Sequence, residues 1–202
     1  MKAQRKNTPT DDNANSHGSC ILSNAIGITN GVYKNVIDSR IRAETSKVVV
    51  VKVDSKLPLG EILWAFSAIR TDIMDSPTTQ PAVIAYPWTS YHADPVPWLT
   101  VKTYFQEIFD LGGTIIVPSG NDAETPGRQA DVDTLPAGWE SPTFPLIVVG
   151  AVDNTGSPAP FSQGPTHVTV WAPGVDVQCA KRGGFRTGSG TSQSAGMVCL
   201  RS

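Results

Sequence analysis

Short, continuously apolar runs alternate along this chain with longer amphipathic stripes, and this alternation constrains the fold more than any other feature. Strands that are buried on both faces read in this way, and they occur in parallel sheets covered by helices. The runs predict strands at 47–53, 82–88, 114–117, 144–152 and 167–172, and the stripes predict helices at 16–28, 58–74, 98–111 and 191–200. The sequence therefore predicts an α/β fold with a mostly parallel sheet and helices on both faces.

The composition fits one globular domain. Of the 202 residues, 40% are hydrophobic and 17% are charged, whereas disordered chains are more polar and more highly charged. No apolar run approaches the roughly 20 residues of a transmembrane helix. The basic start is followed by polar residues, which argues against a signal peptide. We expect a flexible lead at 1–15 and a domain at 16–202, and the sequence leaves the localisation and the oligomeric state undetermined.

Charge and glycine patterning bear on possible partners. The net charge of −2 gives no indication of nucleic acid or a membrane as a partner. Gly183 and Gly188 have the spacing of a phosphate-binding loop, but Ser189 stands where such a loop requires lysine. A nucleotide-binding α/β protein is therefore a weak alternative.

Three reactive polar residues fall at junctions between predicted strands and helices, where function gathers in parallel sheets. Asn121 follows the strand at 114–117, His17 begins the first helix, and Ser192 opens the last helix after a glycine-rich stretch. A helix N-terminus favours negative charge on a serine nucleophile, histidine is its usual base, and an amide donates to an oxyanion. Taken singly, each residue has a plain alternative: a helix cap, a surface histidine and an Asn-Asp turn.

Together these residues stand in motifs that resemble those of the subtilisin family of serine peptidases. The matching strings, within residues 17–202, are His17-Gly18-Ser19, Asn30-Gly31-Val32, Gly120-Asn121, residues 148–153, Phe161-Ser162, Ala172-Pro173-Gly174-Val175 and Gly190-Thr191-Ser192. The resemblance implies a serine endopeptidase that acts on polypeptides without a cofactor. Ser192 would be the nucleophile and His17 the general base, while Asn121 and the Ser192 backbone N–H would hold the oxyanion. Such enzymes often bind structural calcium, but the chain has no calcium-loop signature, so no metal site is expected.

The resemblance also places the walls of the substrate groove. The implied residues are Pro118, Ser119 and Gly120 on one wall of the primary specificity pocket, and Pro87, Trp88 and Thr89 on the other. The family usually has Ser-Leu-Gly on this second wall. Because the side chains here are larger and Pro87 has no N–H to donate, we expect a preference for small side chains or poor peptide binding.

The family's catalytic aspartate has no evident match in this chain. In the family it precedes the histidine, after a strand and within an Asp-Ser/Thr-Gly turn, whereas Asp11 and Asp12 lack that context. The family domain also continues beyond its serine helix, so the chain resembles an incomplete domain clipped at both ends. An alternative of a different class is therefore a catalytically inactive relative that acts as a binding or scaffold module.

The cysteines leave two interpretations open. Cys20, Cys179 and Cys199 are too few for a disulfide framework, and their odd number leaves at least one free thiol. Cys20 follows His17 by three residues, on the same face if that segment is helical. It is expected to be either a reactive thiol beside the active site or a buried, inert helix cysteine.

Overall fold

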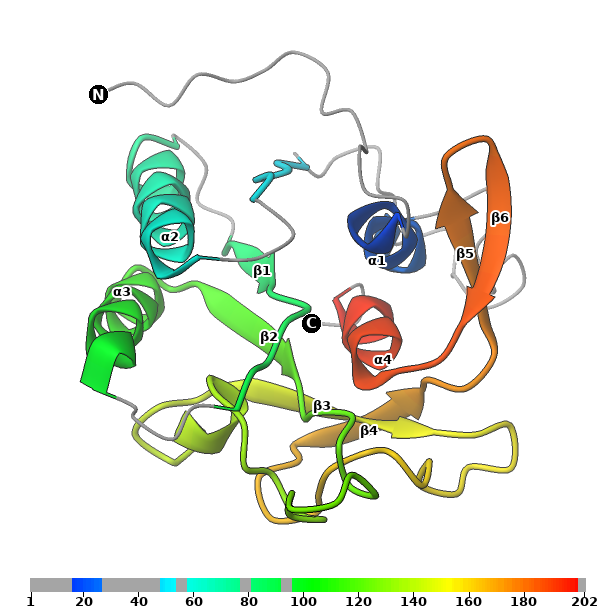
Figure 1. The fold of residues 1–202 in the computed structure, drawn as a ribbon. Helices are drawn as coiled ribbons and strands as arrows, with labels where there is room; N and C mark the ends of the chain where they lie inside the picture. Colours follow the sequence, from blue (N-terminus) through cyan, green and yellow to red (C-terminus); the bar gives the residue numbers. More distant parts are fainter. Residues whose placement is uncertain (1–15, 27–47, 54–57, 77–80, 92–95, 200–202) are drawn as a thin grey trace.

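A parallel four-stranded sheet forms the centre of the structure, a computed structural model that describes residues 16–26, 48–53, 58–76, 81–91 and 96–199 (Figure 1). Neighbouring strands pair in parallel throughout this sheet. Its strands, in their order across the sheet, are β1 (Val83–Ala85), β2 (Thr114–Pro118), β3 (Ile147–Val152) and β4 (Val170–Pro173). The predicted parallel α/β architecture is confirmed.

Helices cover both faces of the sheet, and none of the described ones is long and apolar enough to cross a membrane. In Figure 1, α2 (Leu59–Met74) and α3 (Leu99–Asp110) lie on one side of the sheet, and α1 (His17–Ile26) and α4 (Thr191–Val198) lie on the other. Short 3-10 turns occur at Val96–Trp98 and Ala137–Trp139. The four predicted helices are therefore confirmed, with somewhat shorter bounds.

Strand β2 shows why the apolar runs read as continuous. Successive side chains of a strand point to opposite faces of its sheet. Ile115 and Val117 pack in the core that includes residues of α2 and α3, whereas Ile116 packs in a second core with Ala195 of α4. Because helices lie on both faces, all three side chains are fully buried.

Helices α1 and α4 approach each other closely because α4 has a glycine at the contact. A Cβ atom placed on Gly196 would lie 3.1 Å from both the carbonyl oxygen and the Cγ2 of Ile21, which is tighter than most real contacts. The absence of a side chain at Gly196 therefore lets α1 lie directly against α4. This contact fixes the helix that begins at His17 relative to the helix that contains Ser192.

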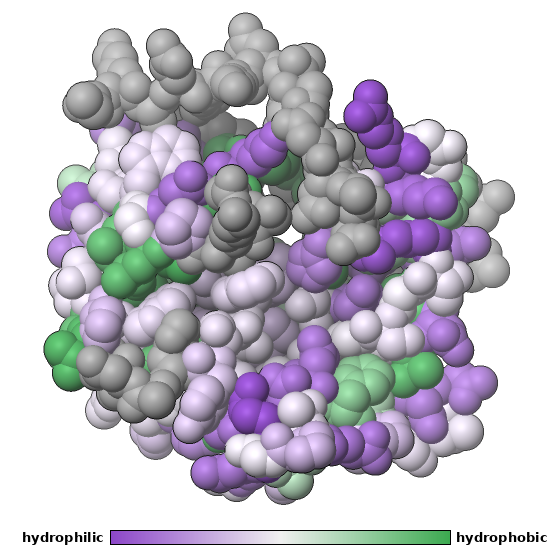
Figure 2. Space-filling model, in the orientation of Figure 1, coloured by the Kyte–Doolittle hydropathy of each residue, from purple (hydrophilic) through white to green (hydrophobic). Residues whose placement is uncertain are grey.

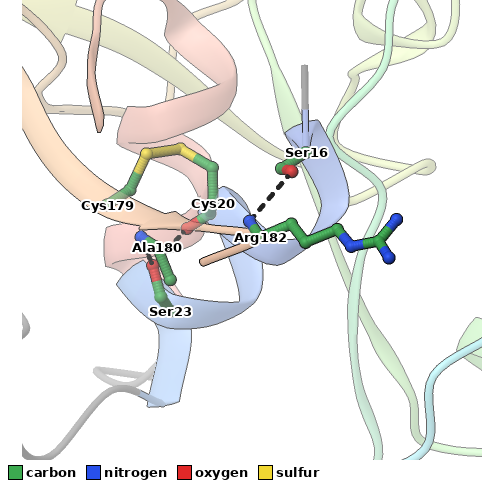
Figure 3. Close-up of a disulfide and its surroundings, with 6 residues drawn as sticks. All are labelled: Ser16, Cys20, Ser23, Cys179, Ala180 and Arg182. Carbon is green, nitrogen blue, oxygen red and sulfur yellow. Dashed lines mark hydrogen bonds between the residues drawn. A yellow bond between two sulfur atoms is a disulfide. The ribbon is translucent and has the colours of Figure 1, made fainter. Parts of the chain in front are cut away.

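The structure adds an antiparallel hairpin that the sequence reading missed, formed by β5 (Val177–Lys181) and β6 (Gly184–Gly188). Its residues alternate between buried and exposed only over the short β5 strand, so they gave no clear apolar run. The hairpin packs on α1, where the Ala180 N–H donates to Ser23 Oγ over 2.9 Å and the Arg182 N–H donates to Ser16 Oγ over 3.2 Å (Figure 3).

A disulfide between Cys20 and Cys179 joins α1 to β5, as Figure 3 shows. The expectation of a reactive Cys20 thiol is therefore wrong; Cys20 is buried in α1, as the alternative interpretation expected, but it forms half of a disulfide. The partner lies 159 residues away in the sequence, so only the tertiary packing of the hairpin on α1 reveals it. Cys199 is the free cysteine among the described residues.

The predicted strand at 47–53 is wrong for the residues that the structure describes. Residues 48–53 have no strand structure, and Val48, Val49 and Val50 are each between 45% and 49% exposed. β-Branched residues favour an extended backbone, but a strand also needs a neighbour to accept and donate hydrogen bonds. No described strand pairs with this segment.

Three further strands are shorter than predicted. β4 begins at Val170 rather than at His167. β1 ends at Ala85 rather than at Trp88, before Pro87, which lacks an N–H donor. β3 begins at Ile147 rather than at Phe144, because Phe144 forms a local bridge with Ser141 instead of joining the sheet. The expected flexible lead at 1–15 lies outside the described residues.

Candidate active site

Ser192 lies in the first turn of α4, held by contacts that explain the small residues around it. The Gly190 N–H donates to the Gly174 carbonyl over 2.8 Å, and Ser194 Oγ donates to the Ala172 carbonyl over 3.0 Å. A Cβ atom on Gly174 would collide with Ser194 Oγ. The Ala-Pro-Gly and Gly-Thr-Ser strings therefore pack closely against each other, and this packing fixes the position of the start of α4.

The Ser192 side chain is 8% exposed, and its Oγ donates to the Pro87 carbonyl over 2.9 Å. Pro87 lies two residues after the carboxyl end of β1, so the sheet places the Pro87 carbonyl beside Ser192. Among the described residues there is no hydrogen bond between Ser192 and His17. In this conformation the serine hydroxyl is therefore bound to the backbone and not to a base.

Asn121, just past the carboxyl end of β2, is clamped to the residue that precedes Ser192. Its Oδ1 accepts from the Thr191 backbone N–H over 2.8 Å and from Thr191 Oγ1 over 2.9 Å. Thr191 Oγ1 in turn accepts from the Gly120 N–H over 3.3 Å. Because Oδ1 is the acceptor in both contacts, the Asn121 Nδ2 group keeps its N–H donors available beside the serine helix.

A second donor comes from the helix itself. The first N–H groups of an α-helix have no intrahelical acceptor and point outward, where they favour negative charge. Ser192 is the second residue of α4, so its backbone N–H belongs to this set. Together with the Asn121 amide, it gives the site the donors that an oxyanion needs.

His17 is the first residue of α1, and the charge nearest to it is positive. Burial lowers the pKa of His17 below its usual value of 6.5, and the Arg186 guanidinium lowers it further. No described carboxylate contacts the ring, and Asp11 and Asp12 lie outside the described residues. The described surroundings therefore favour the neutral imidazole, the form that accepts a proton.

The first predicted wall of the substrate groove is rigidly built. Pro118 ends β2 and Ser119 follows it, and both are buried. Gly120 comes next with φ of +118°, in the region that favours glycine. A Cβ atom at Gly120 would collide with the Oε1 atom of Gln163, which is fully buried. Two constraints therefore select glycine here: the backbone conformation and the side chain beneath it.

Gln163 is a structural residue that the sequence reading missed. Its Nε2 donates to the Gln129 carbonyl, the Asp131 carbonyl and Asp133 Oδ1 over 2.7–3.0 Å, while its Oε1 has no hydrogen-bond partner. These contacts hold the long 119–143 loop against Gly120. Its position after the Phe161-Ser162 pair was the available signal, but a glutamine there does not by itself indicate burial.

The same loop also contains an arginine that is paired with two carboxylates. Arg128 contacts Asp133 at 2.6 Å and Asp122 at 2.8 Å, and its guanidinium lies 4.5 Å from the ring centre of Tyr91. The Arg128 hydrogen bond, supported by Gln163, lowers the pKa of Asp133 to about 2. Such a planar, doubly bonded guanidinium orders the loop behind Asn121.

The second predicted wall carries large and partly exposed groups. Besides the Pro87 carbonyl at the serine, Trp88 is 37% exposed and Thr89 is half-buried. The structure thus brings Pro87 and Asn121 together around Ser192, and it places His17 on the neighbouring helix. Within the described residues, no group of three or more His, Cys, Asp or Glu side chains is arranged to hold a metal ion.

Comparisons with known proteins agree on one family. Residues 2–200 match the model of the subtilase family. A cuticle-degrading serine protease of Arthrobotrys oligospora is 29% identical over 168 residues, which cover 83% of this chain and 35% of that protein. A solved cold-adapted subtilisin-like serine proteinase is similar in fold, with a TM-score of 0.55 and 21% identity over 71% of this chain and 46% of that one. The chain thus spans about a third of the length of the curated relative.

Proposed function

Because this chain belongs to the subtilase family, we propose that it is a serine endopeptidase in which Ser192, His17 and Asn121 act at the start of α4. The observation that supports this most directly is the clamp of Asn121 Oδ1 by Thr191. Because Thr191 occupies Oδ1, the Asn121 amide donors stay available at the N-terminus of the serine helix. A serine that merely caps a helix has no need of such a donor.

In the proposed reaction, Ser192 Oγ attacks the carbonyl carbon of a peptide while neutral His17 takes the hydroxyl proton. The negative charge on the carbonyl oxygen is held by Asn121 Nδ2 and the Ser192 N–H. His17 then gives the proton to the departing amine, and a water molecule hydrolyses the acyl-enzyme by the same route. The Ser192 hydroxyl must first leave the Pro87 carbonyl, which requires a rotation of one side-chain torsion.

The runner-up is a catalytically inactive relative that binds peptides or acts as a scaffold. Two observations favour it: the Ser192 hydroxyl is bound to a backbone carbonyl, and His17 faces a guanidinium instead of a carboxylate among the described residues. Under this alternative the groove would still bind polypeptides without cleaving them.

Labelling with a fluorophosphonate probe separates the two functions. The proposed function expects covalent labelling at Ser192 alone, together with cleavage of a denatured protein substrate, and both should be lost in Ser192→Ala. Ser189→Ala is the matched control, because this nearby serine accepts a backbone N–H from Asp176 and takes no part in the proposed reaction. Labelling at another serine, or cleavage that survives Ser192→Ala, would reject the assignment.

We further propose that the acyl half of the substrate carries small side chains. The side chains of Trp88 and Thr89 on the second wall leave less space in the pocket for a bulky substrate side chain. A peptide series that varies only the residue before the cleaved bond tests this, with alanine expected to be cleaved faster than phenylalanine. Faster cleavage after phenylalanine would contradict it.

A further inference from the structure

A guanidinium without an acidic partner lies beside the candidate site. Arg186 sits in the middle of β6, opposite Cys179 across the hairpin. Its Nε atom is buried and has no hydrogen-bond partner, and none of the ion pairs in the described part of the chain uses this arginine. Leaving a buried charged donor unsatisfied is costly, so such a group commonly awaits an acceptor.

Arg186 reaches the space between the hairpin and the start of α4. The position that a Cβ atom would take on Gly188 lies 4.0 Å from Arg186 Cζ and 2.9 Å from the Nε2 atom of Gln193, the residue after Ser192. The guanidinium charge also acts on the His17 ring. Since Gly188 has no side chain, the space between Arg186 and Gln193 is kept free of one.

The proposed reaction determines which half of a substrate would lie near Arg186. In the proposed reaction, the acyl half of the substrate lies against Asn121, which holds its carbonyl oxygen, and against Pro87 of the second wall. His17 must deliver its proton to the departing amine, so the residue that follows the cleaved bond lies on the His17 side. Arg186 pairs across the hairpin with Cys179, whose disulfide partner Cys20 lies one turn along α1 from His17, so the guanidinium lies on this side of the site.

We propose that Arg186 binds an acidic side chain directly after the cleaved bond, so that this chain selects peptides with Asp or Glu at that position. The inference rests on the proposed peptide binding at Ser192. A carboxylate matches the planar fork of a guanidinium and accepts two parallel hydrogen bonds from it.

Two exposed cations of the same hairpin act at longer range, on the rate at which acidic peptides arrive. Lys181 and Arg182, at the end of the hairpin, are exposed and have no acidic partner among the described residues. Figure 2 shows a strongly hydrophilic surface over this part of the molecule. Positive charge on this face attracts acidic peptides at a distance and steers them toward Arg186.

The test measures peptide binding and peptide cleavage separately. Fluorescent peptides share an alanine-rich sequence and differ only in the residue after the intended cleavage site, which is Asp, Asn or Lys. Binding is followed by fluorescence polarisation on the full chain carrying Ser192→Ala, so that no turnover is needed. Measurements at pH 8 keep His17 neutral in every variant, because its pKa lies below 6.5.

We expect the Asp peptide to bind about tenfold more tightly than the Asn peptide, and the Lys peptide most weakly. Adding Arg186→Gln should abolish the Asp preference, and Arg186→Lys should restore only part of it. Arg182→Gln is the matched control for charge: it removes the same charge from the same hairpin, so it should slow the arrival of acidic peptides and leave the preference of Asp over Asn in place.

Equal binding of the Asp and Asn peptides, a preference that survives Arg186→Gln, or no binding of any peptide would overturn the inference. Cleavage by the unmodified chain tests the proposed function independently. Cleavage without an Asp preference rejects the role of Arg186 alone. An Asp preference in binding without cleavage supports the role of Arg186 and rejects the peptidase.

Discussion

The disulfide between Cys20 and Cys179 is a link whose removal can be given a magnitude. It ties α1, which begins at His17, to the hairpin that carries Arg186. The change to make is Cys179→Ser, or reduction of the unmodified chain. Either one opens the loop that the disulfide closes and leaves α1 attached by non-covalent contacts only.

The stabilisation follows from the length of that loop. In the chain-entropy treatment, a crosslink between positions 159 residues apart contributes about 5 kcal/mol at 25 °C. The free energy of unfolding of a typical domain is only about 5–15 kcal/mol. The remaining hydrogen bonds of Ser16 and Ser23 to the hairpin each contribute about 1 kcal/mol and do not offset the loss. Removing the disulfide should therefore cost a third or more of the total stability.

Unfolding in guanidinium chloride, with and without a thiol reductant, measures this effect. The oxidised chain should unfold at a clearly higher denaturant concentration than the reduced chain or Cys179→Ser. Cys199→Ser is the matched control, because burial raises the pKa of the Cys199 thiol to about 11 and it forms no disulfide. Identical unfolding of oxidised and reduced chains, or alkylation of all three cysteines without reductant, would refute the reasoning.

Three further predictions concern the site. Gly120→Ala should lower the free energy of unfolding by at least about 1–3 kcal/mol, because position 120 has a positive φ and a new Cβ atom there would clash with Gln163. Chemical denaturation should show a smaller loss for Gly127→Ala, because position 127 has a positive φ but space for a Cβ atom. Thr191→Val should lower kcat by about tenfold or more with little change in KM, because Asn121 loses a hydrogen bond that orients it. The pKa of His17 is lowered, so the acid limb of kcat/KM should lie below pH 6.5. For the same reason, the free energy of unfolding should be at its full value above pH 6.5 and should decrease as the pH falls through the pKa of His17 in the folded chain. NMR titration of the ring checks both expectations, and a pKa at or above 6.5 would contradict them.

The sheet and its helices were predictable because burial on two faces leaves a simple pattern. The fully apolar β2 run identified a central strand, and the stripe of 98–111 identified α3, which ends before Gly112 with its φ of +81°. Segment 48–53 shows the limit of this reasoning. Its β-branched residues indicate a preference for an extended backbone, but pairing depends on a neighbouring strand, which the segment's own residues do not specify.

The hairpin and its contacts could not be predicted from the sequence, for a related reason. Neither the pairing of Cys20 with Cys179 nor the burial of Arg186 Nε follows from spacing, because both arise where β5 and β6 pack on α1. Short motifs did indicate Asn121 and Ser192 as candidates. What they did not indicate is the Thr191 clamp, whose geometry depends on the end of β2 meeting the start of α4.

The balance of charge around His17 decides how active this site can be. In the proposed reaction His17 becomes an imidazolium when it takes the proton of Ser192, and both its burial and the charge of Arg186 oppose that state. In subtilisin itself, a member of the same family, losing the aspartate that stabilises the imidazolium costs about 3 × 10⁴ in kcat. At about 1.36 kcal/mol per factor of ten, that is roughly 6 kcal/mol of barrier, more than one oxyanion donor supplies. Turnover at a normal rate therefore requires a carboxylate beside His17, which the described residues do not provide. An acidic side chain of the substrate, bound at Arg186, would neutralise the opposing charge, so the residue that selects the peptide would also relieve part of this barrier.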